Sequence, residues 1–314
     1  MTARGWFLFS LMGVLWGIPY LMIKVAVDGV SPSGVVFVRC LLGAALLLPF
    51  ALRGGGFLAT VRAHWLPMLA FACIEIIGPW WTLTDAERHL SSSLAGLLIA
   101  AVPVLGIALA RLFGDTERLS ARRWLGLLLG FGGVALLAAP ELSGGSAWAI
   151  TEVLLTALGY ATAPLIMTRW LKDVPTLRLI VPCLLLAAAV YAPAGIAGRP
   201  AEVPSAAVLT SLAGLGVFCT ALAFVVFLEL IKEVGPTRAV VFTYVNPAVA
   251  VAAGVAFLSE PLTAAIVRSF GLILTGSVLA TSSQQEGLAD QDVPAVPRSR
   301  ERDGLRSLRD SRDA

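Results

Sequence analysis

Apolar residues run through this chain in ten long blocks, each with about the length of one membrane-crossing helix. A helix needs about 20 predominantly apolar residues to span the hydrocarbon core of a bilayer. The connections between the blocks are short and rich in Pro, Gly and charge. The pattern therefore predicts ten transmembrane helices, at residues 6–27, 34–52, 65–84, 90–111, 121–139, 147–168, 176–196, 207–230, 236–258 and 264–281.

The composition agrees with a polytopic membrane protein rather than a soluble domain with one anchor. Hydrophobic residues make up 58% of the chain, charged residues 14%, and the mean hydropathy is +0.85, whereas soluble domains are about 25% charged. The first block lacks a small-residue cleavage site and is long enough to span, so we predict a retained helix. Residues 282–314 are polar, with six arginines and seven acids, and are predicted to form a disordered cytoplasmic tail.

The chain repeats itself at a spacing of 143 to 145 residues. Three pairs of prolines share this spacing: Pro19 with Pro164, Pro49 with Pro193, and Pro103 with Pro247. The segment Glu117-Arg118-Leu119-Ser120 recurs as Glu260-Pro261-Leu262-Thr263. We therefore predict two five-helix repeats, at 6–139 and 147–281, followed by the tail. Because five is odd, the second repeat must cross the membrane in the opposite orientation, as in many secondary transporters.

The distribution of basic residues predicts the orientation. With the N-terminus placed inside, twelve Lys and Arg precede the tail on the inner side, and five lie on the outer side. Cytoplasmic loops carry an excess of Lys and Arg. Both termini are therefore predicted to be cytoplasmic, in a multi-pass protein of the plasma membrane.

Glu75 is a lone carboxylate in the middle of the third predicted span. An ionised acid at this depth costs about 2.5–3.5 kcal/mol on insertion scales, so Glu75 should face the bundle interior, a partner or water. Pro79 cannot donate to the carbonyl of Glu75, which leaves that carbonyl unpaired. A titratable group beside such a carbonyl suits proton coupling or amine binding. The alternative is a neutral Glu75 hydrogen-bonded to a neighbouring helix.

Other polar and aromatic residues within the spans complete the predicted site, an interior cavity lined by the first, third, fourth, sixth, eighth and ninth helices. The predicted substrate-contacting residues are Trp16, Tyr20, Glu75, Tyr160, Tyr244 and Asn246, with proton coupling at Glu75. Helix breaks are predicted at Pro19, Pro79, Pro103, Pro164 and Pro247, although these prolines could equally serve only to shape the bundle. Arg39 could attract a substrate carboxylate or could be an ordinary helix flank.

Motifs for other chemistry are missing from the sequence. It contains neither an HExxH pair nor a G-x-S-x-G elbow nor a P-loop, and its four cysteines form no CxxC. We therefore predict no metal, no cofactor, no enzymatic activity and no nucleic-acid partner. Without an ATP-binding motif, transport would use an ion gradient or run downhill.

Two stretches of the sequence resemble a known family. WGIPYLMIK, LSSSLAGLLIAAVPVLGIALA and ERLSARRWLGLLLGFGGV are similar to one EamA domain, and VGPTRAVVFTYVNPAVAVAAGVAFLSEPLTAAIVRSFGLILTGSV to a second. The resemblance covers residues 6–281 and indicates the ten-helix branch of the drug/metabolite transporter superfamily. It implies an all-α bundle of two inverted five-helix repeats around a central cavity. It also implies export of small metabolites such as amino acids or toxic compounds.

Together these observations predict a secondary transporter that exports a small amphipathic metabolite by alternating access, with protons as the candidate coupling ion. The lipid bilayer and a small-molecule substrate are its expected partners. One alternative is an uncoupled facilitator or channel, which would need a continuous water-lined path. A less favoured one is an integral-membrane lipid-modifying enzyme, which would need a clustered catalytic set at an interface.

Overall fold

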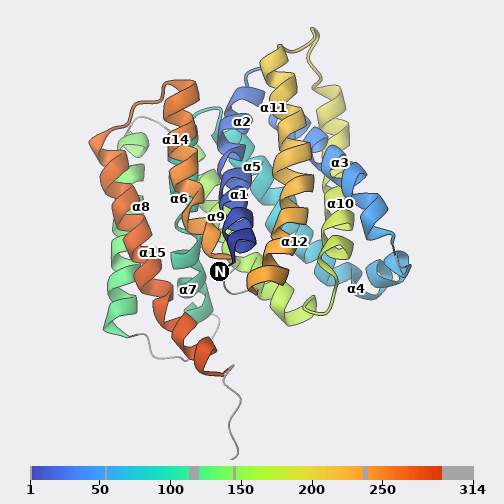
Figure 1. Cartoon of the computed structure of the whole chain (residues 1–314). Helices are drawn as coiled ribbons and strands as arrows, with labels where there is room; N and C mark the ends of the chain where they lie inside the picture. The colour runs from blue at the N-terminus through green and yellow to red at the C-terminus, as the bar shows by residue number, and fades with distance from the viewer. Residues whose placement is uncertain (1, 54, 113–119, 144–145, 236–239, 292–314) are drawn as a thin grey trace, which may run out of the picture. The chain divides into compact units, whose positions relative to one another are not determined.

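All regular secondary structure in the described part of the chain is helical (Figure 1). The computed structural model describes residues 2–53, 55–112, 120–143, 146–235 and 240–291. The helices of the first half are α1 (Ala3–Gly17), α2 (Pro19–Ala26), α3 (Pro32–Ala51), α4 (Phe57–Phe71), η1 (Ala72–Ile77), α5 (Gly78–Ala86), α6 (Ser92–Ile99), α7 (Val102–Leu112) and α8 (Ala121–Ser143). Those of the second half are α9 (Ala147–Trp170), α10 (Thr176–Ala197), α11 (Ala206–Gly216), η2 (Val217–Leu222), α12 (Ala223–Val234), η3 (Val240–Tyr244), α14 (Asn246–Leu258) and α15 (Ala264–Gln291).

These elements account for the predicted spans. Eight helical stretches are long and apolar enough to cross a membrane, and Phe242–Leu258 and Ala264–Leu279 are shorter apolar helices. Only helices satisfy every backbone group within a single membrane-crossing segment, which explains why such apolar blocks adopt this structure. Serine hydroxyls accept from free N–H groups where several helices begin, as Ser31 does from Gly34 and Ser91 from Leu94.

Several helix ends differ from the prediction. The third helical stretch begins at Phe57 rather than at residue 65, directly after Gly56, whose positive φ of 74° suits glycine. Its backbone is kinked at His64, where φ is −123°. The last helix, α15, continues to Gln291, past the predicted end at residue 281. The rest of the predicted tail, 292–314, lies outside the described residues.

The helical stretches are interrupted at most of the predicted prolines. α1 ends just before Pro19, while Pro103 and Pro247 each lie in the first turn of a new helix, α7 and α14. Pro79 lies in the first turn of α5, directly after the π-helical segment η1. At Pro164 the predicted break is absent, because α9 runs without interruption from Ala147 to Trp170. A proline inside a helix removes one hydrogen bond, which the rest of a long helix can tolerate when neighbouring helices support it.

Helices from the two halves of the sequence pack against each other throughout the unit that extends to Ala280. α3 packs along α10, and α6 packs along α14. The first helical stretch of each half contacts the third of the other, since α1 packs on α12 and α9 packs on α5. α8 and α15 approach closely at Gly130 and Gly276, where a Cβ on Gly276 would lie 2.8 Å from the Gly130 Cα. Small residues allow such close approach in membrane bundles.

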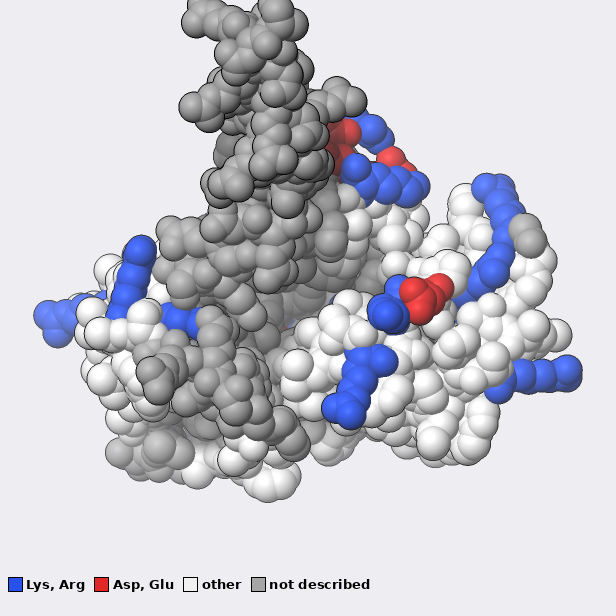
Figure 2. All heavy atoms as spheres, turned by 90° about the horizontal axis from the view of Figure 1, so that it is seen from below, with Lys and Arg blue, Asp and Glu red and all other residues white. Residues whose placement is uncertain are grey.

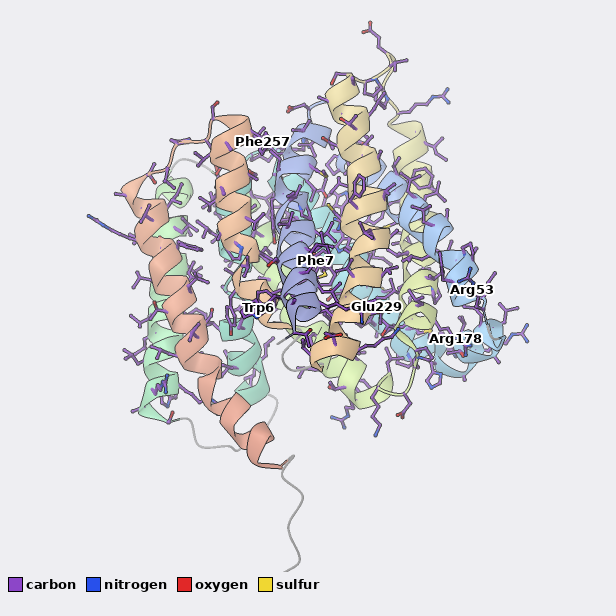
Figure 3. All side chains as sticks on the ribbon, in the orientation of Figure 1. Trp6, Phe7, Arg53, Arg178, Glu229 and Phe257 are labelled. Atoms are coloured by element: carbon purple, nitrogen blue, oxygen red, sulfur yellow. The ribbon has the colours of Figure 1, made fainter. Side chains whose placement is uncertain are left out.

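Basic side chains gather at the end of this unit where the N-terminus lies, called here the lower end, which Figure 2 shows from below. Arg53, Arg178 and Glu229 are at this end, whereas Phe257 is at the opposite, upper end (Figure 3). Arg4 forms ion pairs here with Glu229 at 2.7 Å and Glu233 at 3.3 Å, which join α1 to α12. Exposed pairs of this kind contribute little to stability, so they mark the polar end of the bundle rather than its main support.

Gly159 is required where α9 crosses η1. A Cβ there would overlap the main-chain oxygen of Ile74 and would lie 2.7 Å from Pro79 Cγ. Gly159→Ala should therefore push α9 away from η1 and cost about 1–3 kcal/mol, which thermal unfolding in detergent would detect as a lower midpoint. Gly132→Ala, at a helical glycine with no atom within 4 Å of the added Cβ, is the matched control and should be neutral or stabilising. Equal midpoints for the two variants would contradict this packing.

Candidate functional site

Two helical stretches of the bundle each contain one wide π-helical segment. η1 covers Ala72–Ile77 and η2 covers Val217–Leu222, so they differ by the same 145 residues that separate Pro19 from Pro164. π-Helical turns are rare and are found frequently at functional sites. At this spacing Glu75 in η1 corresponds to Thr220 in η2. The two segments therefore lie at the same spacing in the sequence as the paired prolines.

Arg39 is the basic residue that η2 contacts. It lies about two turns into α3, with a side chain only 7% exposed. Its Nε donates to Thr220 Oγ1 at 3.0 Å, and its guanidinium carbon lies 3.7 Å from the centre of the Trp80 ring. Thr220 Oγ1 in turn donates to the main-chain oxygen of Leu215 at 2.8 Å, within the widened turn. The sequence left Arg39 undecided between flank and ligand, and the structure places it inside the bundle.

Glu75 is half-buried on η1, and the surrounding residues come from other helices. Tyr160 of α9 lies within electrostatic range of Glu75, Tyr20 and Arg39. Cys183 of α10 also lies within range of Glu75. The structure thus brings three of the predicted site residues, Tyr20, Glu75 and Tyr160, into one neighbourhood with Arg39. In this neighbourhood a carboxyl, a guanidinium and two phenols lie at the level of the π-helical segments.

The other predicted residues, Trp16, Tyr244 and Asn246, have different recorded neighbours. Trp16 packs against Phe224, Phe227 and Phe242, with ring centres 5.3 to 5.8 Å apart. Tyr244 is half-buried in η3. Asn246 begins α14, beside the end of α1: its main-chain oxygen would lie 3.1 Å from a Cβ on Gly17. Its buried Oδ1 has no hydrogen-bond partner among the described residues.

At the upper end, the carboxylate of Glu260 joins the connection between α14 and α15 to the start of α6. Glu260 is not among the site residues predicted from the sequence. Glu260, between α14 and α15, accepts from the main-chain N–H groups of Ser92 at 2.7 Å and Ser93 at 2.9 Å. It also accepts from Ser93 Oγ at 2.5 Å. These N–H groups begin α6, where free donors and the helix dipole favour an anion. The recurrence of the Glu117 segment at Glu260 was the available signal, but Glu117 lies outside the described residues.

Lys24 and Glu87 lie near this contact. Lys24 Nζ donates to the main-chain oxygens of Glu87 at 2.6 Å and Leu90 at 2.8 Å. The carboxyl of Glu87 is fully buried, and neither oxygen has a hydrogen-bond partner among the described residues. Burial raises the pKa of Glu87 well above its ordinary value, and the charge of Glu260 adds to this, while Lys24 and Arg39 oppose it. Burial thus favours the protonated form of Glu87.

The raised pKa of Glu87 predicts a pH-dependent stability. The folded state holds the proton more tightly than the unfolded state, so stability should fall as the pH rises above the ordinary carboxyl value of 4.5. Glu87→Gln removes this dependence and should match the parent protein near pH 4 but unfold at a higher temperature near pH 8. Unfolding midpoints of both proteins, measured over that range at one heating rate, would check it. A difference that stays constant with pH would contradict it.

Two apolar grooves of about 320 and 390 Å³ lie away from these polar residues. The first is lined by α7, α8 and α9, with Phe131 and Leu154 among its residues. The second is lined by α14 and α15, with Val251 and Phe270 among its residues. Neither is lined by a predicted substrate-contacting residue. The central cavity predicted from the sequence therefore stays a prediction.

The fold is that of a multi-pass helical membrane protein. Known proteins place it more narrowly: the EamA-like transporter family matches residues 3–139 and 147–282. The chain belongs to this family, and the two matched segments correspond to the two repeats predicted from the sequence.

Curated relatives are also described as membrane transporters. An Escherichia coli K12 protein, described as the uncharacterized inner membrane transporter YedA, is 27% identical over 87% of this chain and 89% of its own length. YvbV of Bacillus subtilis 168, described as an uncharacterized transporter, is 25% identical over 88% and 92%. One crystal structure matches with a TM-score of 0.63 at 20% identity, over 91% of this chain and 99% of that chain, which supports the fold.

Proposed function

We propose that this protein is a secondary transporter that exports a small amphipathic metabolite, an amino acid or a related compound, across the plasma membrane by alternating access. The observation that carries this proposal is the pairing of π-helical segments at equivalent positions of two family segments. Interrupted helices at matching positions of two repeats point to a substrate site between them. Tyr20, Glu75 and Tyr160 lie in the neighbourhood of these segments and supply polar and aromatic contacts.

The inverted relation of the two halves is part of this proposal. Each half supplies five helical stretches, so the second half starts from the opposite side of the membrane. The reciprocal packing of α1 on α12 and α9 on α5 supports an exchange of the halves about a two-fold axis. The basic residues Arg53 and Arg178 at the lower end (Figure 3) support a cytoplasmic N-terminus.

Proton coupling at Glu75 completes the proposal. The protein can change between its two access states at low cost only when a carboxyl at mid-span is protonated, because the ionised form is costly in the membrane. Glu75 is half-buried near Tyr160, and no ion pair to it is recorded among the described residues. This leaves its carboxyl available for exchange with water or with an amine of the substrate.

Purified protein in liposomes tests the function directly. Vesicles with an imposed pH gradient would be supplied with labelled amino acids and related metabolites, and uptake would be compared with empty vesicles. The proposal expects saturable uptake that increases with the gradient. Saturable uptake without any effect of the gradient would indicate an uncoupled facilitator. The absence of uptake across the whole panel would reject an amino acid or related compound as the substrate.

A further inference from the structure

Arg39 is a buried cation whose recorded contacts are all uncharged. Within the described residues its side chain contacts the Thr220 hydroxyl through Nε and the face of the Trp80 ring. The ion pairs of the described residues involve Arg4, Arg88 and Lys232, and none involves Arg39. A charged side chain within a transmembrane segment is costly and normally marks a functional pathway or a paired charge.

The two contacts orient the guanidinium and leave one edge open. Thr220 accepts the Nε hydrogen and Trp80 covers one face of the guanidinium plane. The two terminal nitrogens have no hydrogen-bond acceptor among the described residues. This pair of nitrogens matches the two oxygens of a carboxylate, which arginine binds in a bidentate manner. Trp80 belongs to α5 and Thr220 to η2, so two other helices hold the guanidinium in place before any ligand binds.

Glu87 is the resident acid that acts on Arg39, and it does not serve as its ion-pair partner. It attracts Arg39 from a distance, but neither of its oxygens has a hydrogen-bond partner among the described residues. Burial favours the protonated form of Glu87, and no ion pair to Arg39 is present among the described residues. Tyr20 and Tyr160 lie within electrostatic range of Arg39.

We propose that Arg39 binds a carboxylate of the transported molecule through its terminal nitrogens, with Thr220 and Trp80 holding the guanidinium in position. The inference rests on the proposed transport function and narrows its substrate class to small molecules with a carboxylate and an apolar or aromatic body. Tyr20 and Tyr160 contact that body. The charge of the substrate then supplies the counter-ion that the described residues do not provide.

Binding of benzoate tests this site with a probe that has both a carboxylate and an aromatic body. Full-length protein in nanodiscs would be titrated with benzoate, with neutral benzamide and with cationic benzylamine, and tryptophan emission would report occupancy beside Trp80. Because a charge-assisted bidentate contact is lost with benzamide, benzoate should bind about tenfold or more tightly than benzamide. Arg39→Gln should abolish this preference. Arg39→Lys should retain part of it, because lysine keeps the positive charge but lacks the paired nitrogens of the guanidinium.

Arg169→Gln is the matched control. Arg169 also lies over a tryptophan, 5.1 Å from the ring centre of Trp170, but its side chain is exposed. This variant should keep the benzoate preference unchanged. Equal preference in Arg39→Gln and the parent protein would overturn the site. If Arg39→Gln does not fold, the parent protein alone still tests the site. Equal binding of benzoate and benzamide by the parent protein, or no saturable binding of benzoate, would also overturn the proposed site.

The liposome assay separates this site from the proposed function. Gradient-driven uptake of a solute without a carboxylate, unchanged by Arg39→Gln, would keep the transporter and reject the carboxylate site. Arg39-dependent benzoate binding without transport of any solute would keep the site and reject the transport function.

Discussion

Glu75→Gln is expected to abolish the stimulation of transport by a pH gradient. Neutralising a carboxylate at mid-span relieves about 2.5–3.5 kcal/mol, which corresponds to a factor of roughly 100 in an equilibrium. Glutamine carries no exchangeable charge, so the variant should cross between its access states without a proton. Uptake into liposomes with the gradient should then fall to the rate measured without the gradient.

A second acid provides the control for this experiment. Glu202 is exposed in the connection between α10 and α11, and Glu202→Gln should retain the full gradient effect. Unchanged pH dependence in Glu75→Gln would exclude Glu75 as the proton carrier. In that case the alternative identified from the sequence, a neutral hydrogen-bonded Glu75 with a structural role, would apply.

Glu260→Leu is expected to lower stability strongly through the upper end of the bundle. The substitution removes the acceptor of three hydrogen bonds from Ser92 and Ser93. Both serines are buried, at 0% and 1% exposure, so water cannot readily replace the lost acceptor. Each buried donor left unpaired costs about 1–3 kcal/mol. We therefore expect the unfolding midpoint to fall by roughly 5–10 °C in detergent.

Glu202→Leu and Glu260→Gln separate the cause of this loss. Glu202→Leu adds the same apolar side chain at an exposed position of the same end and should leave the midpoint nearly unchanged. Glu260→Gln keeps one acceptor oxygen and should fall between the parent and Glu260→Leu. A midpoint for Glu260→Leu equal to that of Glu202→Leu would show that the contact with α6 does not support the fold.

The candidate site was only partly predictable from the sequence. Polar residues in apolar blocks pointed to Tyr20, Glu75 and Tyr160, which the structure brings into one neighbourhood. The same reasoning selected Trp16, whose ring packs among three phenylalanines and whose contact with substrate stays a prediction. It could not connect Arg39 to Thr220, because 181 residues separate them and neither side chain is unusual by itself. Such a contact depends on which helices become neighbours.

Proline shows the same division between local and tertiary effects. Pro19 and Pro164 occupy equivalent positions in the repeat, yet the helix is interrupted only at Pro19. The missing N–H is a property of the residue, whereas the response of the helix depends on whether its neighbours support a continuous path. The π-helical segments were likewise not predicted, because the register of hydrogen bonds is not visible in the hydrophobic pattern.

The sequence by itself determined the apolar blocks, the repeated spacing of prolines and the acid at mid-span, because the cost of polar groups in lipid acts on each block separately. Only the tertiary structure decided which polar groups meet, where helices widen into π-turns, and which prolines interrupt a helix. These features depend on contacts between helices far apart in the chain, such as Gly159 against Ile74 and Arg39 against Thr220.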